Sequence, residues 1–423
     1  MRALYTFLFH LALPAVLLRL WWKSRRNPAY RRRIGERFGR IPRLPARPRI
    51  WVHCVSVGET IAAAPLLRRL LERHPDHALL VTTTTPTGSD QLRRLFGETV
   101  EHCYLPLDLP FAVKGFLDRA APRLAVVLET ELWPNLYAAL AARGIPLILI
   151  NARLSERSFD GYRRYAPTLV RETLGGVRVL AAQGELDAAR FRALGIDPAR
   201  VVVTGNLKFD LDLPADLDEQ GRALREELGD GRPVWVAAST HTGEEAEVLA
   251  AHRAVLTALP DALLVLVPRH PERAGEVERL TVEVGLPAAR RSRGDAVTAG
   301  TAVYLVDTLG ELMRFYAAAD VCFVGGSLVP VGGHNLIEPA VLGRPVLSGP
   351  FLHNFTEIAT RLREHAALVE VGDAPALADA VLSLLRDTAA RAGLGEGARA
   401  VVSRNRGARQ HTLELIDPLL GND

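Results

Sequence analysis

Short, largely apolar segments alternate with helix-like segments along almost the whole chain, and this alternation constrains the fold more than any other feature. The apolar segments fall into two blocks: residues 50–55, 78–82, 124–128, 147–151, 179–182 and 201–203, then 234–238, 263–267, 302–306, 321–324 and 345–347. A strand that is apolar at successive positions has both sides buried, as in a parallel sheet covered by helices on both faces. The sequence therefore predicts an α/β protein with doubly wound sheets.

The polar segment 206–232 interrupts this rhythm and separates two blocks of similar size. A chain of 423 residues is too long for one hydrophobic core, so two domains are expected. We predict four parts after the N-terminal segment: a first domain at 23–205, a linker at 206–232, a second domain at 233–398 and a closing helix at 399–423. In the closing helix, Gly407 is a predicted weak point and Pro418 a predicted stop.

Residues 3–22 are mostly apolar and have about the length that crosses a bilayer, roughly 20 residues. Three residues interrupt the run: His10, Pro14 and Arg19. Trp21 and Trp22 would lie at the membrane interface, and the basic residues beyond them favour the cytoplasmic side. Residues 1–22 are therefore predicted to form a membrane anchor helix. The helix either spans the bilayer or lies in its interface, with the rest of the chain in the cytoplasm.

The net charge of +4 is largely local to the stretch 19–40, where basic residues are opposed only by Glu36. The rest of the chain is close to neutral or slightly acidic. This distribution argues against a general nucleic-acid-binding protein and favours a localised basic patch.

Polar residues follow four successive predicted strands in the first half. Glu59 stands after the strand 50–55, where it could act as a general base or only cap the next helix. The hydroxyl-rich loop that contains Thr85 could bind sugar hydroxyls or a phosphate, or could be an N-cap with turn residues. Glu129 opens a segment that suits either saccharide binding or a plain helix start, and Arg153 follows the next strand. Four polar strand ends at one sheet edge together favour a binding site.

In the second half, the stretch 331–339 (VGGHNLIEP) is typical of a nucleotide cradle. Its two glycines permit a tight turn and close approach to a ligand. Asn335 stands where a helix N-cap would stand, and a helix N-terminus suits a phosphate. Glu338, one turn further on, could accept ribose hydroxyls. The alternative is an ordinary strand–loop–helix corner, because glycine loops are common.

Three other strand ends in this half carry polar residues. Arg269 could bind a phosphate through two hydrogen bonds, or form a surface ion pair with Glu272. The segments 239–245 and 307–312 could face a cleft, or could serve only as helix caps. Two such domains would suit a donor in one and an acceptor in the other.

Several motifs are absent from the sequence. It contains no GxxxxGK[ST], no GxSxG and no metal-ligand cluster, and no DxD stands near a strand end, since the DxD spacing at 210–212 lies in the predicted linker. A metal-dependent sugar transferase is thereby disfavoured. The cysteines lie far apart without CxxC spacing, which predicts buried free thiols: Cys54, Cys103 and Cys322.

Taken together, these segments resemble the Kdo transferases of lipopolysaccharide synthesis (3-deoxy-D-manno-octulosonic acid transferases). The matching segments run in family order over nearly the whole chain: 51–60, 83–90, 105–110, 129–135, 151–158, 205–210, 239–245, 268–273, 307–312 and 325–338. The resemblance implies a GT-B glycosyltransferase with two Rossmann-like domains at the inner membrane. It implies CMP-Kdo as donor and the glucosamine 6′-hydroxyl of a lipid A precursor (lipid IVA) as acceptor, with no metal or other cofactor.

The resemblance also implies residue roles. Glu59 matches the catalytic base of an inverting transfer. The CMP-binding segments of the family are matched by Pro268, Arg269, Leu309, Gly310, Glu311, Asn335, Leu336, Ile337 and Glu338. The candidate contacts to Kdo or to the acceptor are Lys208, which we pair with the Kdo carboxylate, and Ser56, Gly58, Thr85, Glu129 and Arg153.

Two other functions remain open at this point. One is a GT-B envelope transferase that uses a UDP-sugar, and protection of the fold by CMP but not UDP would discriminate against it. The other is a non-catalytic, membrane-attached protein that binds nucleotide sugars and would not need Glu59. The sequence does not specify how many Kdo residues are added.

Overall fold

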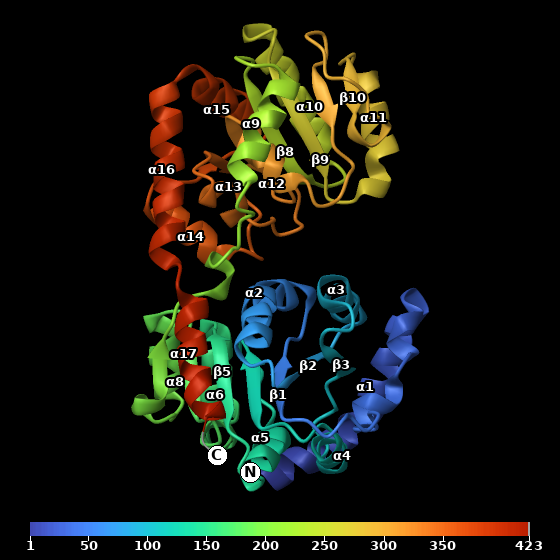
Figure 1. The fold of residues 1–423 in the computed structure, drawn as a ribbon, viewed down its shortest axis with the longest axis vertical. Helices are drawn as coiled ribbons and strands as arrows, with labels where there is room; N and C mark the ends of the chain where they lie inside the picture. The colour runs from blue at the N-terminus through green and yellow to red at the C-terminus, as the bar shows by residue number, and fades with distance from the viewer. Residues whose placement is uncertain (422–423) are drawn as a thin grey trace. The chain divides into compact units, whose positions relative to one another are not determined.

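The computed structural model describes residues 1–421, which fall into two compact units (Figure 1). Unit 1 comprises Met1–Asp210 and Arg406–Asp423, and unit 2 comprises Leu211–Asn405. Each unit contains one seven-stranded parallel sheet with helices on both faces. The predicted α/β class with two doubly wound domains is confirmed.

The sheet of unit 1 has the strand order β3-β2-β1-β4-β5-β6-β7. Its strands are β1 (Arg49–His53), β2 (Ala78–Thr83), β3 (Glu101–Tyr104), β4 (Leu124–Leu128), β5 (Leu147–Ala152), β6 (Val179–Ala182) and β7 (Val201–Val203). Successive residues of β1 enter different cores, since Trp51 packs with Phe116 on one face whereas Ile50 and Val52 pack with Leu66 on the other. Burial on both faces explains why these strands are apolar at every position.

The helices of unit 1 are α1 (Arg2–Arg26), α2 (Val57–Arg73), α3 (Pro86–Phe96), α4 (Pro110–Ala120), α5 (Pro134–Ala142), α6 (Glu156–Tyr165), α7 (Pro167–Leu174), α8 (Glu185–Ala193) and α17 (Ala408–Leu420). Four of them begin with a proline, whose fixed φ and missing N–H suit the first helical position: α3, α4, α5 and α7. Local sequence therefore specifies where these helices begin.

The sheet of unit 2 has the order β10-β11-β9-β8-β12-β13-β14. Its strands are β8 (Val234–Thr240), β9 (Leu263–Pro268), β10 (Ala288–Arg290), β11 (Val303–Leu305), β12 (Val321–Val324), β13 (Val346–Ser348) and β14 (Val369–Glu370). Its helices are α9 (Leu217–Leu228), α10 (Glu244–Ala258), α11 (Ala274–Glu283), α12 (Leu312–Ala318), α13 (Ile337–Val341), α14 (Thr356–Glu364), α15 (Ala374–Arg386) and α16 (Thr388–Asn405). Trp235 and Phe323 lie in the core of this unit.

In both sheets the chain reverses its direction of strand addition beside the first strand. The reversal falls between β1 and β4 in unit 1, and between β8 and β12 in unit 2. Ligands of doubly wound sheets bind at the carboxyl ends of the strands at this switch point. The switch points therefore define where a site in each unit is expected.

The boundaries of the units differ from the predicted parts. The segment predicted as a linker contains α9, which belongs to unit 2, and the predicted closing helix is two helices. The break falls at Gly407 (φ 104°), as expected, but Pro418 lies inside α17 rather than stopping it. Asp210 holds the chain as it returns to unit 1, because its carboxylate accepts hydrogen bonds from the N–H groups of Gly407 (2.7 Å) and Arg409 (2.5 Å).

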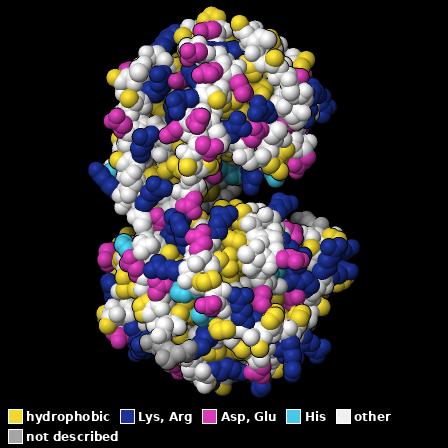
Figure 2. Space-filling view, in the orientation of Figure 1, with side chains coloured by type: hydrophobic (Ala, Val, Ile, Leu, Met, Phe, Trp, Pro, Cys, Tyr) yellow, Lys and Arg dark blue, Asp and Glu magenta, His cyan; other side chains and the backbone are white. Residues whose placement is uncertain are grey.

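Acidic and basic side chains are interspersed over the face of each unit that is visible in Figure 2. The basic excess of the sequence therefore does not form one continuous patch on that face.

Candidate functional site

The switch point of unit 1 positions Glu59 in the first turn of α2. The carboxylate accepts hydrogen bonds from the N–H of Val55 (2.8 Å) and the hydroxyl of Ser56 (3.2 Å). The Ser56 hydroxyl in turn caps the N–H of Glu59, although that contact is long, at 3.5 Å. This is close to a capping box, so the helix-capping interpretation of Glu59 is confirmed. Capping also holds the carboxylate in one orientation at the mouth of the sheet.

Two further carboxylates follow β4, the strand on the other side of the switch point. Glu131 accepts a hydrogen bond from the indole N–H of Trp133 (3.0 Å), and its backbone carbonyl accepts one from Tyr137. Glu129 has a left-handed backbone (φ 56°), which is uncommon for a residue with a side chain and occurs often at functional sites. The pairing of β1 with β4 brings these carboxylates into the electrostatic range of Glu59.

Two carboxylates of this cluster, those of Glu59 and Glu131, resist ionisation. Burial, and next the negative charge of Glu129, raise the pKa of Glu59 to about 7. Burial likewise raises the pKa of Glu131 to about 7. The hydrogen bond from Trp133 lowers this pKa, whereas the negative charge of Glu129 raises it. A carboxyl group with a pKa near 7 can both accept and release a proton at neutral pH.

The other candidate contacts of unit 1 lie on neighbouring strand ends. Thr85 caps α3 by accepting from the N–H of Gly88 (3.1 Å), which confirms its capping interpretation, and Gly58 is exposed in the first turn of α2. Arg153 is exposed, and its carbonyl accepts from the hydroxyl of Thr130.

Lys208 is half-buried in a turn that is joined to the end of β5. In this turn the N–H of Leu207 donates to the side-chain oxygen of Asn151 (3.0 Å), and the N–H of Lys208 donates to Asn206 (3.0 Å). The structure thus brings the turn of Lys208 to the same sheet edge as the predicted strand-end residues. The ligand contacts assigned to these residues stay predictions.

At the switch point of unit 2, a buried carboxylate binds the loop after β12. Glu244 accepts four backbone N–H bonds, from Gly326 (2.7 Å), Leu328 (2.8 Å), Ser327 (3.0 Å) and His241 (3.2 Å). A Cβ at Gly325 would approach the Glu244 carboxylate to 2.6 Å, so only glycine fits there. The two alternatives predicted for the segment 239–245, a cleft-facing segment or a helix cap, do not include this role of Glu244. The available indication in the sequence is the pair of adjacent glutamates, Glu244 and Glu245, shortly after an apolar strand.

A cluster of three imidazoles lies beside this carboxylate. The Nε2 atoms of His241 and His334 are 2.9 Å apart and their rings are stacked, with 5.1 Å between centroids, while His270 meets His241 edge to face at 5.5 Å. Burial, then the charges of Arg269, His241 and His270, lower the pKa of His334 to about 4. The pKa of His241 is also lowered, first by burial and then by His270. The sequence analysis assigned no role to these histidines, which lie up to 93 residues apart.

The predicted cradle residues join this cluster. The side chain of Asn335 accepts from the N–H of Ile337 (3.1 Å) and donates to Glu338 (3.1 Å). The N-cap of α13 is Leu336, so the predicted N-cap position of Asn335 is wrong by one residue, and Asn335 binds the first helical N–H from just before the helix. Burial raises the pKa of Glu338, while Asn335 and the charge of Arg269 lower it. The Arg269 side chain is exposed at the end of β9, and its charge acts on both Glu338 and His334. The buried residues beside them are Pro268, Leu336 and Ile337.

The segment 307–312 forms a loop that is held by ion pairs and is exposed at Leu309 and Gly310. Glu311 accepts from Arg291 (2.9 Å) and Arg314 (3.0 Å), and the hydrogen bond from Arg291 is the main cause that lowers its pKa. Leu309 is 80% exposed and Gly310 is left-handed (φ 88°). The Glu311 carboxylate thus anchors the loop.

Within residues 1–421, no group of three or more His, Cys, Asp or Glu side chains lies close enough together to bind a metal ion. The prediction of metal-independent transfer stays a prediction.

Comparison with known proteins gives one consistent result. Residues 32–211 match the family model described as 3-deoxy-D-manno-octulosonic-acid transferase (kdotransferase). The chain is 41% identical to the 3-deoxy-D-manno-octulosonic acid transferase of Haemophilus influenzae and 39% identical to that of Bordetella pertussis. The alignments cover 99% of this chain in both cases, and 99% and 100% of the relatives.

Among solved structures, a glycosyltransferase from Rickettsia africae shares the two-unit fold. It aligns with a TM-score of 0.55 at 14% identity, over 89% of this chain and all of the other. At this identity the likeness concerns the fold alone, which is that of a GT-B protein.

Proposed function

The chain belongs to the family of 3-deoxy-D-manno-octulosonic acid (Kdo) transferases, and from that membership we propose how its residues carry out the transfer. It is a glycosyltransferase that transfers Kdo in lipopolysaccharide biosynthesis. We assign CMP-Kdo as its donor, and the 6′-hydroxyl of a lipid A precursor (lipid IVA) as its acceptor. The transfer inverts the configuration at the anomeric carbon.

Glu59 is the general base in this proposal, and its environment is the observation that carries the assignment. A sugar hydroxyl is a poor nucleophile, so its proton must leave as the oxygen attacks the anomeric carbon. Glu59 lies at the switch point of unit 1, is fixed by two hydrogen bonds, and has a pKa raised to about 7. As the new carbon–oxygen bond forms, the bond to the CMP phosphate breaks, and Glu59 takes the hydroxyl proton.

Unit 2 supplies the donor site in the same proposal. The leaving phosphate gains charge as its bond to Kdo breaks, and the guanidinium of Arg269 can stabilise that charge through two hydrogen bonds. Glu338, oriented by Asn335, accepts the ribose hydroxyls. The backbone of the loop 307–312 contacts the nucleobase of CMP. Lys208 is assigned to bind the Kdo carboxylate.

Membrane attachment completes the proposal. Residues 2–25 form a helix that is long and apolar enough to cross a membrane, with a mean hydropathy of 1.7 in its most apolar window. The basic residues after it favour the anionic, cytoplasmic face of the inner membrane. The acceptor is itself a membrane lipid, so attachment would keep the enzyme at its substrate.

The test is the Glu59→Gln substitution, which keeps the shape of the side chain and removes the base. Purified protein would be supplied with CMP-Kdo and lipid A precursor, and the lipid product followed by mass spectrometry. We expect the rate to fall about 10²–10⁴-fold. Thermal protection of the protein by CMP should be unchanged.

The matched control is Glu72→Gln, which alters an exposed glutamate of the same helix and should keep full activity. A folded, CMP-binding Glu59→Gln protein that transfers Kdo at the normal rate would exclude Glu59 as the base.

A further inference from the structure

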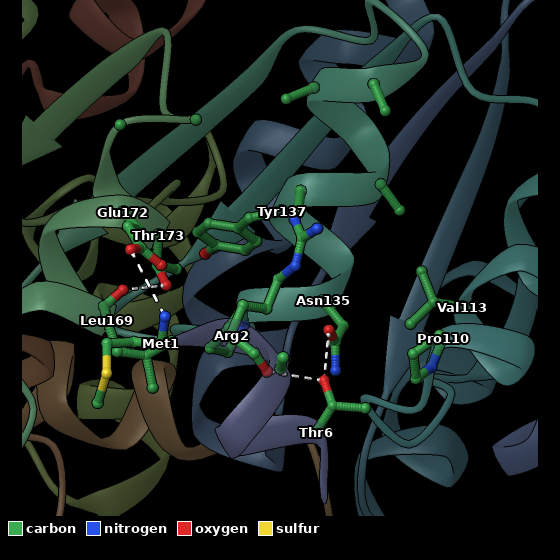
Figure 3. Close-up of a pocket in the computed structure, with 18 of the residues that line it drawn as sticks. Met1, Arg2, Thr6, Pro110, Val113, Asn135, Tyr137, Leu169, Glu172 and Thr173 are labelled. Atoms are coloured by element: carbon green, nitrogen blue, oxygen red, sulfur yellow. Dashed lines mark hydrogen bonds and ion pairs between the residues drawn. The ribbon is translucent and has the colours of Figure 1, made fainter.

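The first turns of α1 are attached to the globular part of unit 1 through polar contacts. The hydroxyl of Thr6 donates to the side-chain oxygen of Asn135 in α5 (3.0 Å), and the N-terminal ammonium group lies 3.8 Å from the carboxylate of Glu172 in α7. Figure 3 shows Thr6 directed at Asn135, and Met1 beside Glu172. Groups that meet α5 and α7 in this way lie against protein rather than in the hydrocarbon of a bilayer.

A third contact involves a buried carboxylate. Asp108 accepts from the N–H groups of Asn135 (2.9 Å) and Leu136 (2.8 Å), where it caps α5, and it also accepts from the hydroxyl of Tyr5. Its carboxylate is 1% exposed, so α1 takes part in a buried polar network of the domain. Breaking this contact would remove one of the three hydrogen bonds that this buried carboxylate accepts.

These contacts also leave space between the helices. A cavity of about 1240 Å³ lies between α1 and the helices α4, α5 and α7 (Figure 3). Polar contacts, rather than close packing, therefore hold the first ten residues of α1 in place.

The length of helix that remains is too short to cross a bilayer. The apolar run ends at Trp22, and residues 11–22 cover only about 18 Å at 1.5 Å per residue. A bilayer core is roughly 30 Å thick. Residues 1–10 cannot both dock on α5 and α7 and extend through the hydrocarbon.

The exposed side of α1 has the pattern of an interfacial helix. Its large exposed apolar residues recur at spacings of three, four and seven along one side: Leu4, Phe7, Leu8, Leu11, Leu18, Trp21 and Trp22. Arg19 and Arg25 are exposed near the C-terminal end of α1, and Arg31 and Arg32 are exposed just beyond it. The guanidinium groups of Arg25 and Arg31 lie 5.6 and 5.8 Å from the ring centre of Trp21. An apolar stripe beside tryptophans and arginines suits the headgroup region of an anionic leaflet.

We propose that α1 does not span the membrane, but lies in the interface of one anionic leaflet while its first ten residues stay docked on unit 1. This inference rests on the proposed membrane attachment and specifies that the attachment is interfacial rather than spanning. The whole chain, including Met1, then lies on one side of the bilayer. The alternative, a spanning helix, places the N-terminus on the opposite side from the catalytic units.

Labelling of a single cysteine tests the proposal in cells. The three native cysteines are buried, so Cys introduced for the exposed Ala3 would be the reactive thiol. Cells with a permeabilised outer membrane would be treated with a membrane-impermeant maleimide, before and after rupture of the inner membrane. We expect labelling only after rupture, with the protein in the membrane fraction. Labelling of Ala3→Cys before rupture would overturn the proposal.

A second measurement reads the docking directly. In isolated membranes, a short bismaleimide should join the thiols of a Thr6→Cys, Asn135→Cys double variant, whereas Leu18→Cys with Asn135→Cys should stay unlinked. Failure of the first pair to link in membranes would also overturn the proposal. Recovery of the unmodified chain in the soluble fraction would instead refute the membrane attachment itself, without bearing on Kdo transfer by unit 1 and unit 2.

Discussion

The two switch points are built on the same strand arrangement, yet they collect opposite kinds of titratable group. In unit 1 the loops after β1 and β4 bring together the carboxylates of Glu59, Glu129 and Glu131. In unit 2 the loops after β8 and β12 bring together the imidazoles of His241 and His334. Burial is the first cause of the pKa shifts in both units: it raises the pKa values of Glu59 and Glu131 and lowers those of His241 and His334.

Desolvation thus disfavours the charged form of the carboxyl groups in unit 1 and of the imidazoles in unit 2. The two units differ in which groups stay charged. Unit 1 keeps carboxylates that exchange protons near pH 7, as a base requires. Unit 2 keeps the positive charge of the Arg269 guanidinium, which acts on Glu338 and His334. One unit is suited to moving a proton and the other to binding a phosphate with a fixed charge.

Glu244 is a carboxylate of unit 2 with a structural role, since it binds the loop after β12. Of the substitutions predicted here, its loss should give the largest effect, a decrease in the free energy of unfolding. Glu244→Ala leaves four backbone N–H groups without their acceptor. Each buried, unpaired group costs about 1–3 kcal/mol, so we expect a loss of at least roughly 3 kcal/mol in the free energy of unfolding. Chemical denaturation would measure it. Glu283→Ala, at an exposed position of the same unit, is the control. Equal stability of the two variants would show that the N–H groups have other partners.

The fixed charge of unit 2 gives the next prediction. Arg269→Ala should lower kcat about 10²–10³-fold, the typical cost of removing one group that stabilises transition-state charge. Arg269→Lys should recover only part of this loss, because an ammonium group cannot make the two parallel hydrogen bonds of a guanidinium. Steady-state kinetics with CMP-Kdo would test it, with the exposed Arg253→Ala as control. Full recovery by lysine would reduce the role of Arg269 to that of a point charge.

How far the sequence predicts these features depends on whether their causes are local. The buried strands were predicted because residues such as Trp51 and Val52 are apolar on both sides of the sheet. The strands β3, β10 and β14 were not predicted, since they are short and partly polar, as in Glu101–Tyr104. The capping roles of Glu59 and Thr85 are also local, and the sequence contains their spacing.

The features that the sequence did not predict depend on contacts between distant segments. The stacked pair of His241 and His334 forms only because β8 pairs with β12. The boundary of unit 1 depends on Asp210, which binds the N–H of Gly407 almost 200 residues later. No periodicity or motif in the sequence indicates such a pairing, so these contacts can be recognised only in the folded structure.

The pH dependence of the transfer is predicted by the unit 1 cluster. Glu59 must be ionised to accept a proton, and its pKa is about 7. The logarithm of kcat/KM should therefore rise with pH up to about 7 and then level, with activity at pH 5 about 100-fold below the plateau. Glu129→Gln removes a negative charge that raises this pKa, so the rising limb should move to lower pH. Profiles measured for Glu129→Gln and for the control Glu72→Gln would separate this effect from a general one. An unmoved limb would mean that Glu129 does not act on the base.

The smallest effect is expected from the imidazoles of unit 2, and it tests the comparison most directly. Because the pKa of His334 is about 4, its ring is neutral at pH 7 and can offer a phosphate one uncharged hydrogen bond at most. Such a bond contributes about 1 kcal/mol, so His334→Asn should weaken CMP binding roughly fivefold, far less than the loss expected for Arg269→Ala. Calorimetric titration with CMP would measure it, with the exposed His365→Asn as control. A loss of a hundredfold or more would show that His334 binds the phosphate as a cation. The histidines of unit 2 would then carry a proton at pH 7. In that case proton exchange near pH 7 would no longer distinguish the switch point of unit 1 from that of unit 2.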